Sequence, residues 1–255
     1  MKNRIVLPKD FYEKFITNQG YEISIIDYKG ANNCTIEFND KHKTILHTIK
    51  MEHVRKGNIK NPFHPLVWGV GYLGIREYKK DYDIELKPTY KKWNRLLERG
   101  YSKTLKEKYP TYKDIVVCED WHNFQNFIPW YKENWKDYMQ GWHLDKDILI
   151  KGNKIYSPET CCFVPQEVNI LFIKNSKRRE GLPIGVYKQK NSFVAHLSKG
   201  KEQIYLGSFS TIEECFQAYK IAKEEYIKEM ADKWKPLIHL KVYEAMYNYK
   251  VEITD

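Results

Sequence analysis

The stretch from Trp142 to Asn169, WHLDKDILIKGNKIYSPETCCFVPQEVN, decides the expected fold of the middle of this chain. It begins with His143, Asp145 and Asp147 at every second position, so a strand here would place the three side chains on one face. Imidazole and carboxylate groups that converge in this way can hold a hard divalent cation such as Mg²⁺. The spacing therefore predicts a cation site on this strand.

Two turns and a helix are expected after this strand. The pair Gly152–Asn153 is typical of a tight hairpin turn, and Pro158–Glu159 marks a second turn. Apolar residues at positions 164, 168, 171 and 172 then recur at helical spacing. Two short strands, a turn and a helix around acidic and amide side chains are the outline of a ββα-metal site.

Within this stretch, LDKD, GN and YSPETC occur in the order of the motifs LDR-D, GNY and SPENC. This order resembles the divergent HNH-endonuclease core of many bacteriophage proteins. The resemblance implies that Asp145 is a metal ligand and that Asn153 is the loop asparagine of the core. Lys146 stands where the family keeps the histidine that activates water, and Thr160 stands where it keeps a last asparagine ligand. Two of the four motif positions thus depart from the family pattern.

The segment before this stretch carries the same resemblance. Ahead of its core the family has one helix with the pattern W-x-x-(M/L)-x-x-R-x-Y and a second with V-C-x-x-W-x-x-F-x-x-F. The matching residues here are Trp93, Arg99 and Tyr101, and then Val117, Cys118, Trp121, Phe124 and Phe127. The resemblance therefore covers about residues 90 to 172.

The composition of the whole chain points to a polyanionic partner. The 255 residues carry a formal net charge of +10, and 42% of them are hydrophobic. The hydrophobic share is sufficient for folded cores, and the basic balance favours nucleic acid as the partner. The alternative is a lysine-rich chain that is basic without such a partner.

Cysteine usage and hydropathy indicate the cellular location. The five cysteines include no CxxC pair, which predicts reduced, buried thiols and no structural zinc. No segment approaches the roughly 18 consecutive apolar residues of a membrane span, and no apolar leader begins the chain. We expect a cytoplasmic protein with no membrane partner, and the resemblance implies a phage protein in its bacterial host.

Residues 1–85 are expected to form a small β-rich domain. The alternating segments YEISIIDY and CTIEF predict strands, separated by the turn-rich KGANN and NDKHK. The later run GVGYLG is not followed by GK[ST], so its glycines are interpreted as turn residues and not as a phosphate loop. This part resembles a module that begins many phage proteins with HNH-like cores. Its role is either DNA contact or scaffolding.

The C-terminal module, expected over residues 182–236, is the clearest local pattern. Alternation predicts strands at about 185–190, 193–198 and 203–207, and Thr211 with Glu214 predicts a capping box at the start of a helix. The outer face of the sheet is expected to carry Tyr187, Gln189, His196, Ser198 and Tyr205, flanked by Lys188, Lys190, Lys199 and Lys201.

The segments GVY, FVAHL, YLGSF and TIEECFQAY resemble the AP2 DNA-binding domain, which has GVR, W-x-AEI, WLGTF and T-x-EEAA-x-AY. The resemblance implies that the outer face enters the major groove of double-stranded DNA. Tyr187 and Tyr205 replace the Arg and Trp of the family, so a different sequence preference is expected. A protein-interaction module is the alternative. The candidate DNA-binding residues are Tyr187, Lys188, Gln189, Lys190, His196, Ser198, Lys199 and Tyr205, with Lys177, Arg178 and Arg179 of a basic linker.

These patterns together predict an α+β protein in four parts. They are a small N-terminal β-domain at 1–85, a central helical and ββα-metal unit at 86–175, an AP2-like three-stranded sheet with one helix at 182–236, and a tail at 237–255. For the tail, a last helix is one option.

Two functions remain open from the sequence. The first is a DNA endonuclease that uses Mg²⁺ or Mn²⁺, with Asp145, Asp147 and Thr160 as ligands. His143 or Lys146 would act as the base, or Lys146 would stabilise the phosphate as a cation, with Asn153 in the loop. The second is a DNA-binding regulator or anti-defence protein that keeps an inactive core. The sequence decides neither the recognition site nor the oligomeric state.

Overall fold

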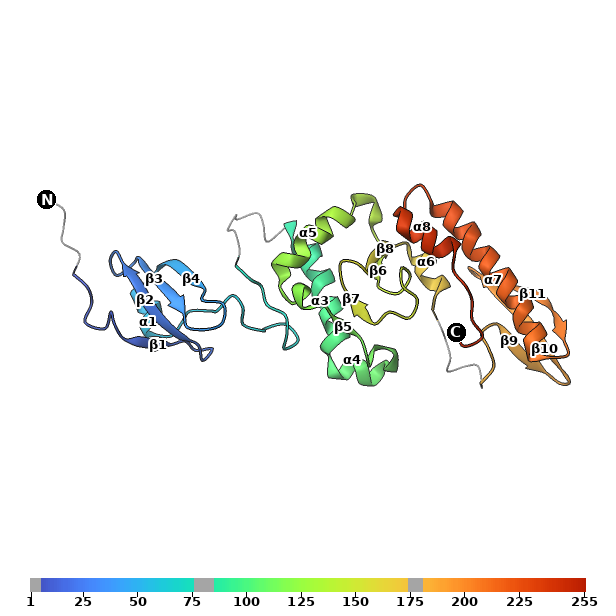
Figure 1. Ribbon diagram of the computed structural model, residues 1–255, viewed down its shortest axis with the longest axis horizontal. Helices are drawn as coiled ribbons and strands as arrows, with labels where there is room; N and C mark the ends of the chain where they lie inside the picture. The colour runs from blue at the N-terminus through green and yellow to red at the C-terminus, as the bar shows by residue number, and fades with distance from the viewer. Residues whose placement is uncertain (1–5, 76–84, 174–180) are drawn as a thin grey trace. The chain divides into compact units, whose positions relative to one another are not determined.

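The computed structural model describes residues 6–75, 85–173 and 181–255 (Figure 1). The fold is mixed α+β, as predicted. The chain divides into two compact units, one of Met1–Lys113 with Val117–Pro129 and one of Asp114–Val116 with Trp130–Asp255. The central part predicted at 86–175 contributes residues to both units.

A four-stranded antiparallel sheet in the order β1-β2-β3-β4 opens the first unit. Its elements are β1 (Lys14–Ile16), β2 (Glu22–Tyr28), β3 (Cys34–Phe38), β4 (Ile45–Ile49) and the short helix α1 (Met51–Arg55). Ile23, Ile36 and Phe38 alternate onto one face of the sheet and are buried with Met51 and Val54 of α1. The β-rich N-terminal part predicted from alternation is thus confirmed.

The glycine-rich run at 69–74 belongs to the helical part of the first unit and not to this sheet. The amide of Tyr72 donates to the carbonyl of His122, and the amide of Phe124 donates to the carbonyl of Tyr72, each at 2.9 Å. A Cβ added at Gly71 would meet Leu97 and Trp93 of helix α3 (Lys87–Tyr101). The run therefore completes the backbone hydrogen bonding of the segment at 122–124, which lies beyond the predicted boundary at residue 85.

Helices surround this run in the first unit. Their core contains the fully buried Trp93, whose indole N–H donates to the carbonyl of Trp121 at 2.6 Å. The helix expected over 117–127 is interrupted, because the backbone of Tyr72 bridges residues 122 and 124 where helical hydrogen bonds would run. The elements of this segment are α3 (Lys87–Tyr101), α4 (Lys103–Lys108), η1 (Pro110–Tyr112), β5 (Val116–Val117), η2 (Glu119–His122) and α5 (Phe124–Asn134).

A ββα arrangement is present in the second unit, but its pairing differs from the expected hairpin. Strands β6 and β8 pair antiparallel, with Asp145 opposite Cys162, and helix α6 follows. The turn at Gly152, with φ of +79°, leads into β7, whose neighbour Lys154 accepts a hydrogen bond from the amide of Val116. The elements are η3 (Asp137–Met139), β6 (His143–Asp145), β7 (Ile155–Tyr156), β8 (Cys162–Val164) and α6 (Gln166–Leu171).

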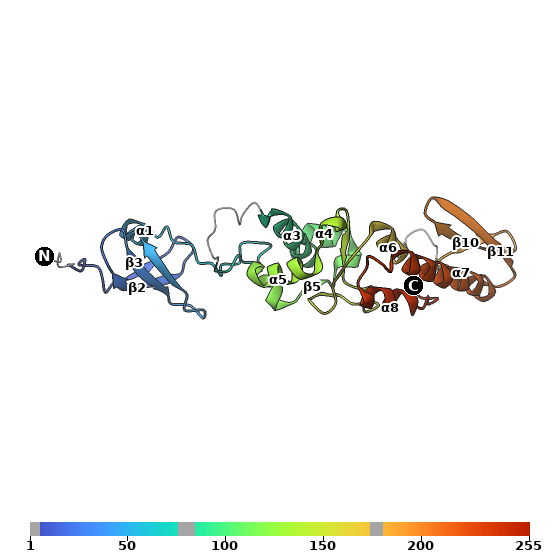
Figure 2. The same cartoon turned by 90° about the horizontal axis from the view of Figure 1, so that it is seen from above.

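The C-terminal module forms as predicted. Strands β9 (Val186–Gln189), β10 (Ser192–Lys199) and β11 (Glu202–Phe209) make an antiparallel sheet in the order β11-β10-β9. Helix α7 (Ile212–Trp234) runs along this sheet in both views (Figures 1 and 2). Thr211 forms the predicted capping box with Glu214. The tail contains helix α8 (Leu240–Tyr247), which packs on α7.

This module is continuous with the ββα segment, so the predicted boundary near residue 182 does not separate compact units. Trp142 packs edge-on against Trp234 of α7, with ring centroids 5.9 Å apart. The hydroxyl of Tyr138 donates to the carbonyl of Leu237 at 3.0 Å, and Lys233 forms an ion pair with Glu167 of α6 at 2.8 Å. These contacts fix α7 to the ββα segment.

Four of the five cysteine thiols are buried and all five are free, as expected. None of the helices in the described ranges is long and apolar enough to cross a membrane.

Candidate functional site

Asp145 ends strand β6 and shapes the loop that follows. Its Oδ1 atom accepts hydrogen bonds from the amides of Asp147 and Ile148, each at 2.8 Å. A carboxylate that captures two following amides turns the backbone out of the extended conformation. The strand therefore stops at Asp145, and the prediction that His143, Asp145 and Asp147 alternate along one strand is wrong for Asp147.

The environment of Asp145 disfavours its charged form. Burial, followed by the nearby charge of Asp147, raises the pKa of Asp145 from 3.8 to about 6. The two backbone hydrogen bonds from Ile148 and Asp147 act in the opposite direction and only partly offset burial. The structure thus brings two carboxyl groups together at a point where one of them is costly to ionise, which is a common property of functional sites.

Lys146 and Asn153 close the same loop. The side-chain ammonium of Lys146 donates to the backbone carbonyl of Asn153 at 2.9 Å. In return, the side-chain amide of Asn153 donates to the backbone carbonyl of Lys146 at 2.6 Å. Lys146 also forms an ion pair with Asp147 at 3.4 Å, and its side chain is only 10% exposed. This reciprocal pair holds the ends of the loop together, so Lys146 is placed as a buried structural cation beside the carboxylates.

Thr160 lies in the next turn and is committed to local hydrogen bonds. Its hydroxyl donates to the carbonyl of Ile155 at 2.7 Å, which is the carbonyl that Asn153 also contacts at 2.7 Å. The hydroxyl oxygen of Thr160 also accepts a hydrogen bond from the backbone amide of Ser157 at 3.2 Å. The hydroxyl of Ser157 also lies 3.1 Å from this Thr160 oxygen. Thr160 therefore shapes the turn before β8, and the oxygen of the predicted cation ligand is occupied by local hydrogen bonds.

His143 occupies the other end of β6. Its Nδ1 atom lies 3.3 Å from the side-chain nitrogen of Asn169 in α6. Because His143 and Asp145 are two residues apart on one strand, their side chains share a face. Asn169, which the motif analysis did not single out, orients the ring of the candidate base.

The residues at this loop fit a hard divalent cation in part. Asp145 and Asp147 supply two carboxylates in contact, whose mutual repulsion a bound cation would relieve. Within the described ranges, no group of three His, Cys, Asp or Glu side chains gathers at a single point. Asp145 and Asp147 are thus the ligands that would hold Mg²⁺ or Mn²⁺, with the remaining positions left to water and a phosphate oxygen.

Replacing Asn153 tests whether the loop depends on this reciprocal pair. Asn153→Ala removes two side-chain donors at 2.6 and 2.7 Å and leaves the carbonyl of Lys146 without that partner. We expect a loss of roughly 2 kcal/mol in the free energy of unfolding, measured by urea denaturation. Asn191→Ala, in an exposed turn, is the control and should change it by less than about 0.5 kcal/mol. An equal effect of the two would contradict a structural role for Asn153.

A second candidate site is the outer face of the C-terminal sheet. Tyr187 of β9, His196 of β10 and Tyr205 of β11 form a continuous row, here called the aromatic row. The His196 ring lies 5.6 Å from each tyrosine ring, at interplanar angles of 74° and 60°. Tyr187 is 48% exposed and Tyr205 60%. The predicted outer-face placement of these three residues is therefore confirmed.

A β-bulge sets the register of the aromatic row. The pairing of β10 with β11 shifts between Ala195 and His196, so that Ala195 opposes Gly207 while His196 opposes Tyr205. The extra residue of β11 is therefore Leu206. Without this shift, the period of two would place Tyr205 and His196 out of register on the face.

The remaining predicted DNA-binding residues fall into three groups. Lys188, Gln189, Lys190 and Ser198 are exposed at the sheet. Lys199 instead turns toward α7, where it forms an ion pair with Glu229 at 2.7 Å and lies 4.8 Å from the ring of Tyr226. Lys199 was expected to flank the outer face, and these interactions direct its side chain toward α7 instead. Lys177, Arg178 and Arg179 lie outside the described residues.

Charge is distributed unevenly within this module. The sheet segment at 186–209 contains four lysines and one glutamate, whereas α7 contains four lysines against five glutamates and one aspartate. The formal difference is +3 for the sheet and −2 for the helix. The sheet segment is therefore the more basic part of this module, although one of its lysines, Lys199, is paired with Glu229 of α7.

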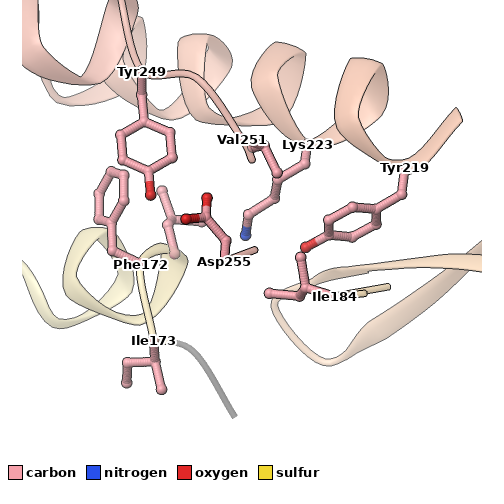
Figure 3. A pocket seen from close by; sticks show the side chains of 9 residues that line it. Phe172, Ile173, Ile184, Tyr219, Lys223, Tyr249, Val251 and Asp255 are labelled. Carbon is pink, nitrogen blue, oxygen red and sulfur yellow. The ribbon is translucent and has the colours of Figure 1, made fainter. Parts of the chain in front are cut away.

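Sequence reasoning missed a partly buried lysine on α7. Lys223 points into a small cavity with Tyr219, Tyr249 and Asp255 around it (Figure 3). Burial lowers the pKa of Lys223 from 10.5 to about 8. No local motif signals this position, because the tail that covers it comes from residues 249–255.

Removing the charge of Lys223 should stabilise the chain. A base whose pKa falls on folding holds its proton less tightly when folded, so its cost to stability grows as the pH falls from about 10.5 to about 8 and is complete at neutral pH. Lys223→Met should raise the free energy of unfolding near neutral pH by on the order of 2 kcal/mol and leave it little changed near pH 10. Denaturation at both pH values measures this, with the exposed Lys241→Met as control. A gain that is independent of pH would indicate packing alone.

Comparison with protein-family models, curated proteins and solved structures finds no match to this chain.

Proposed function

We propose that this chain binds DNA through the outer face of its C-terminal sheet. The observation that supports this most is the aromatic row on the basic side of a module whose helix is acidic. A three-stranded sheet is narrow enough to lie in the major groove, and exposed lysines at its edges meet phosphates. The net charge of +10 for the whole chain acts in the same direction.

A second candidate function is metal-dependent cleavage of DNA at Asp145, as in the HNH-like cores that the sequence resembles. The raised pKa of Asp145 beside Asp147 favours it, because a carboxylate that is costly to ionise and lies next to a second carboxylate is an unfavourable feature for a loop to keep without a cation. A bound Mg²⁺ would polarise the scissile phosphate. His143 is the candidate base that takes the proton of the attacking water, while Lys146 is held by the loop.

The hydrogen bonds of Lys146 and Thr160 also support the alternative of a regulator with an inactive core. Both side chains donate hydrogen bonds to backbone carbonyls of this segment, and both stand where the family keeps catalytic groups. In that case the ββα segment would serve as a scaffold for α7, through contacts such as the ion pair between Lys233 and Glu167. A bacteriophage protein that acts in the bacterial cytoplasm is our proposal for either function.

Supercoiled and linear DNA, incubated with the wild type and Asp145→Ala in Mg²⁺ or EDTA, separates these functions. Retardation should weaken steeply between about 50 and 200 mM salt if lysines meet phosphates. Nicking that needs Mg²⁺ and is lost in Asp145→Ala, with retardation kept, supports the endonuclease. Retardation without cleavage in Mg²⁺ or Mn²⁺ supports the regulator. No retardation by either protein would overturn the proposal of DNA binding.

A further inference from the structure

The centre of the aromatic row lacks the side chains that read paired bases. Bidentate recognition of base edges in the major groove uses Arg or Lys on guanine and Asn or Gln on adenine. The outer-face positions inside the row carry Val194 and Ser208, and Val194 is only 6% exposed, while Gln189 and Gln203 lie on this face beyond the two ends of the row. The centre of the face therefore presents aromatic rings and hydroxyl groups, and not the charged or amide groups that form bidentate hydrogen bonds with base edges.

The exposed rings of Tyr187 and Tyr205 are suited to stacking. Base–aromatic stacking contributes about 1–3 kcal/mol per base and works with every base, because each base has a π-face. His196 packs between the two tyrosines and restricts their rings before any ligand arrives. Less conformational entropy is then lost on binding than with two free side chains.

The spacing of the two tyrosines determines whether paired or unpaired bases can stack on both of them. Tyr187 and Tyr205 lie on the two strands that flank β10. Neighbouring strands are about 4.8 Å apart, which separates the two tyrosine positions by roughly 9.6 Å across the sheet. Tyr187 opposes Val194 and Tyr205 opposes His196, so the two positions are also offset by about 6.8 Å along the strands and lie roughly 12 Å apart. Consecutive bases in a duplex rise by only about 3.4 Å and present edges, not faces, to the grooves. Both tyrosines can be occupied only when the bases are unpaired and splayed.

We infer that the aromatic row binds unpaired bases of single-stranded nucleic acid, with one base on Tyr187 and one on Tyr205. Lys188, Lys190 and Lys201, exposed at the sheet edges, would meet the phosphates of the same strand. This inference rests on the proposed function, and it changes the preferred ligand of the sheet from a duplex to a single strand.

Fluorescence anisotropy tests this with a labelled DNA strand of about 16 nucleotides, the same strand in duplex form, and an RNA strand of the same sequence. Tyr187→Ala and Tyr205→Ala should each weaken single-strand binding by about 10-fold or more, whereas Tyr187→Phe and Tyr205→Phe, which keep the rings, should stay within about 2-fold. Tyr109→Ala removes an exposed tyrosine of the first unit and is the matched control.

The outcomes separate the inference from the proposed function. Tighter binding of the single strand than of the duplex, with the Ala–Phe difference above, supports the inference, and the RNA strand shows whether the sugar matters. Tighter binding of the duplex, with the Phe variants as weak as the Ala variants, would overturn the inference and leave DNA binding intact. No binding of any probe would overturn both. Circular dichroism of each variant confirms that the module is folded.

Discussion

Asp145→Asn should stabilise the protein while it removes any metal-dependent cleavage. The pKa of Asp145 rises from 3.8 to about 6 on folding, so the folded chain holds this proton more tightly than the unfolded chain does. The contribution of Asp145 to the free energy of unfolding is therefore largest below about pH 4 and is lost as the pH rises through about 6. Asparagine cannot ionise, and its oxygen can still accept from the amides of Asp147 and Ile148.

At neutral pH in EDTA, we expect the free energy of unfolding of Asp145→Asn to exceed that of the wild type by on the order of 2 kcal/mol. The difference should shrink toward zero near pH 4. Nicking, if present, should fall by more than about 100-fold, since even outer-shell partners of metal ligands contribute about 10- to 100-fold. Asp137→Asn, an exposed acid of η3, is the control. A less stable Asp145→Asn at neutral pH would mean that the carboxylate serves the loop alone.

Gly185→Ala should have the largest structural effect in the C-terminal module. Gly185 precedes β9 with φ of +79°, a conformation that favours glycine. A Cβ at this position would lie 2.0 Å from Cδ2 of Tyr219, which is 4% exposed and packed in the core of the module. The carbonyl of Gly185 also accepts from the amide of His196 at 2.9 Å, so a displaced backbone would disturb the centre of the aromatic row.

We expect Gly185→Ala to cost at least about 3 kcal/mol, from backbone strain and overpacking together. Binding of DNA by the sheet should decline with it. Gly200→Ala is the matched control, because Gly200 also has positive φ, at +62°, but has no neighbour within 4 Å of an added Cβ. It should cost only about 1–2 kcal/mol. Equal urea midpoints for the two variants would show that Tyr219 yields to the new methyl group.

Local sequence signals were sufficient where one segment determines its own structure. The capping box of Thr211 and Glu214 and the alternation in β9 to β11 depend on neighbours within a few residues, and both were predicted correctly. The aromatic row followed from the same alternation, although the bulge at Leu206 sets its register. Lys199 was misplaced because its partner, Glu229, is 30 residues away.

The site at Asp145 could be predicted only in part, for a related reason. The motif order identified Asp145, Lys146, Asn153 and Thr160, but not that the last three bind backbone carbonyls. Side-chain hydrogen bonds in irregular loops compete with strand pairing and leave no periodic pattern. For the same reason, Gly152–Asn153 indicated a turn correctly without indicating which strands it would join. The cover of Lys223 by the distant residues Tyr249, Val251 and Asp255 leaves no local sequence signal either.

The docking of residues 69–74 on the helices of the first unit governs how the chain can be shortened. A fragment that begins at residue 86 would lose the backbone partners of His122 and Phe124 and would uncover Trp93, which is 0% exposed in the intact chain. Such a fragment would carry an indole-sized apolar surface into solvent and tend to self-associate. A fragment that starts before residue 67 keeps this cover, so the natural cut lies inside the region that composition alone would assign to the N-terminal sheet.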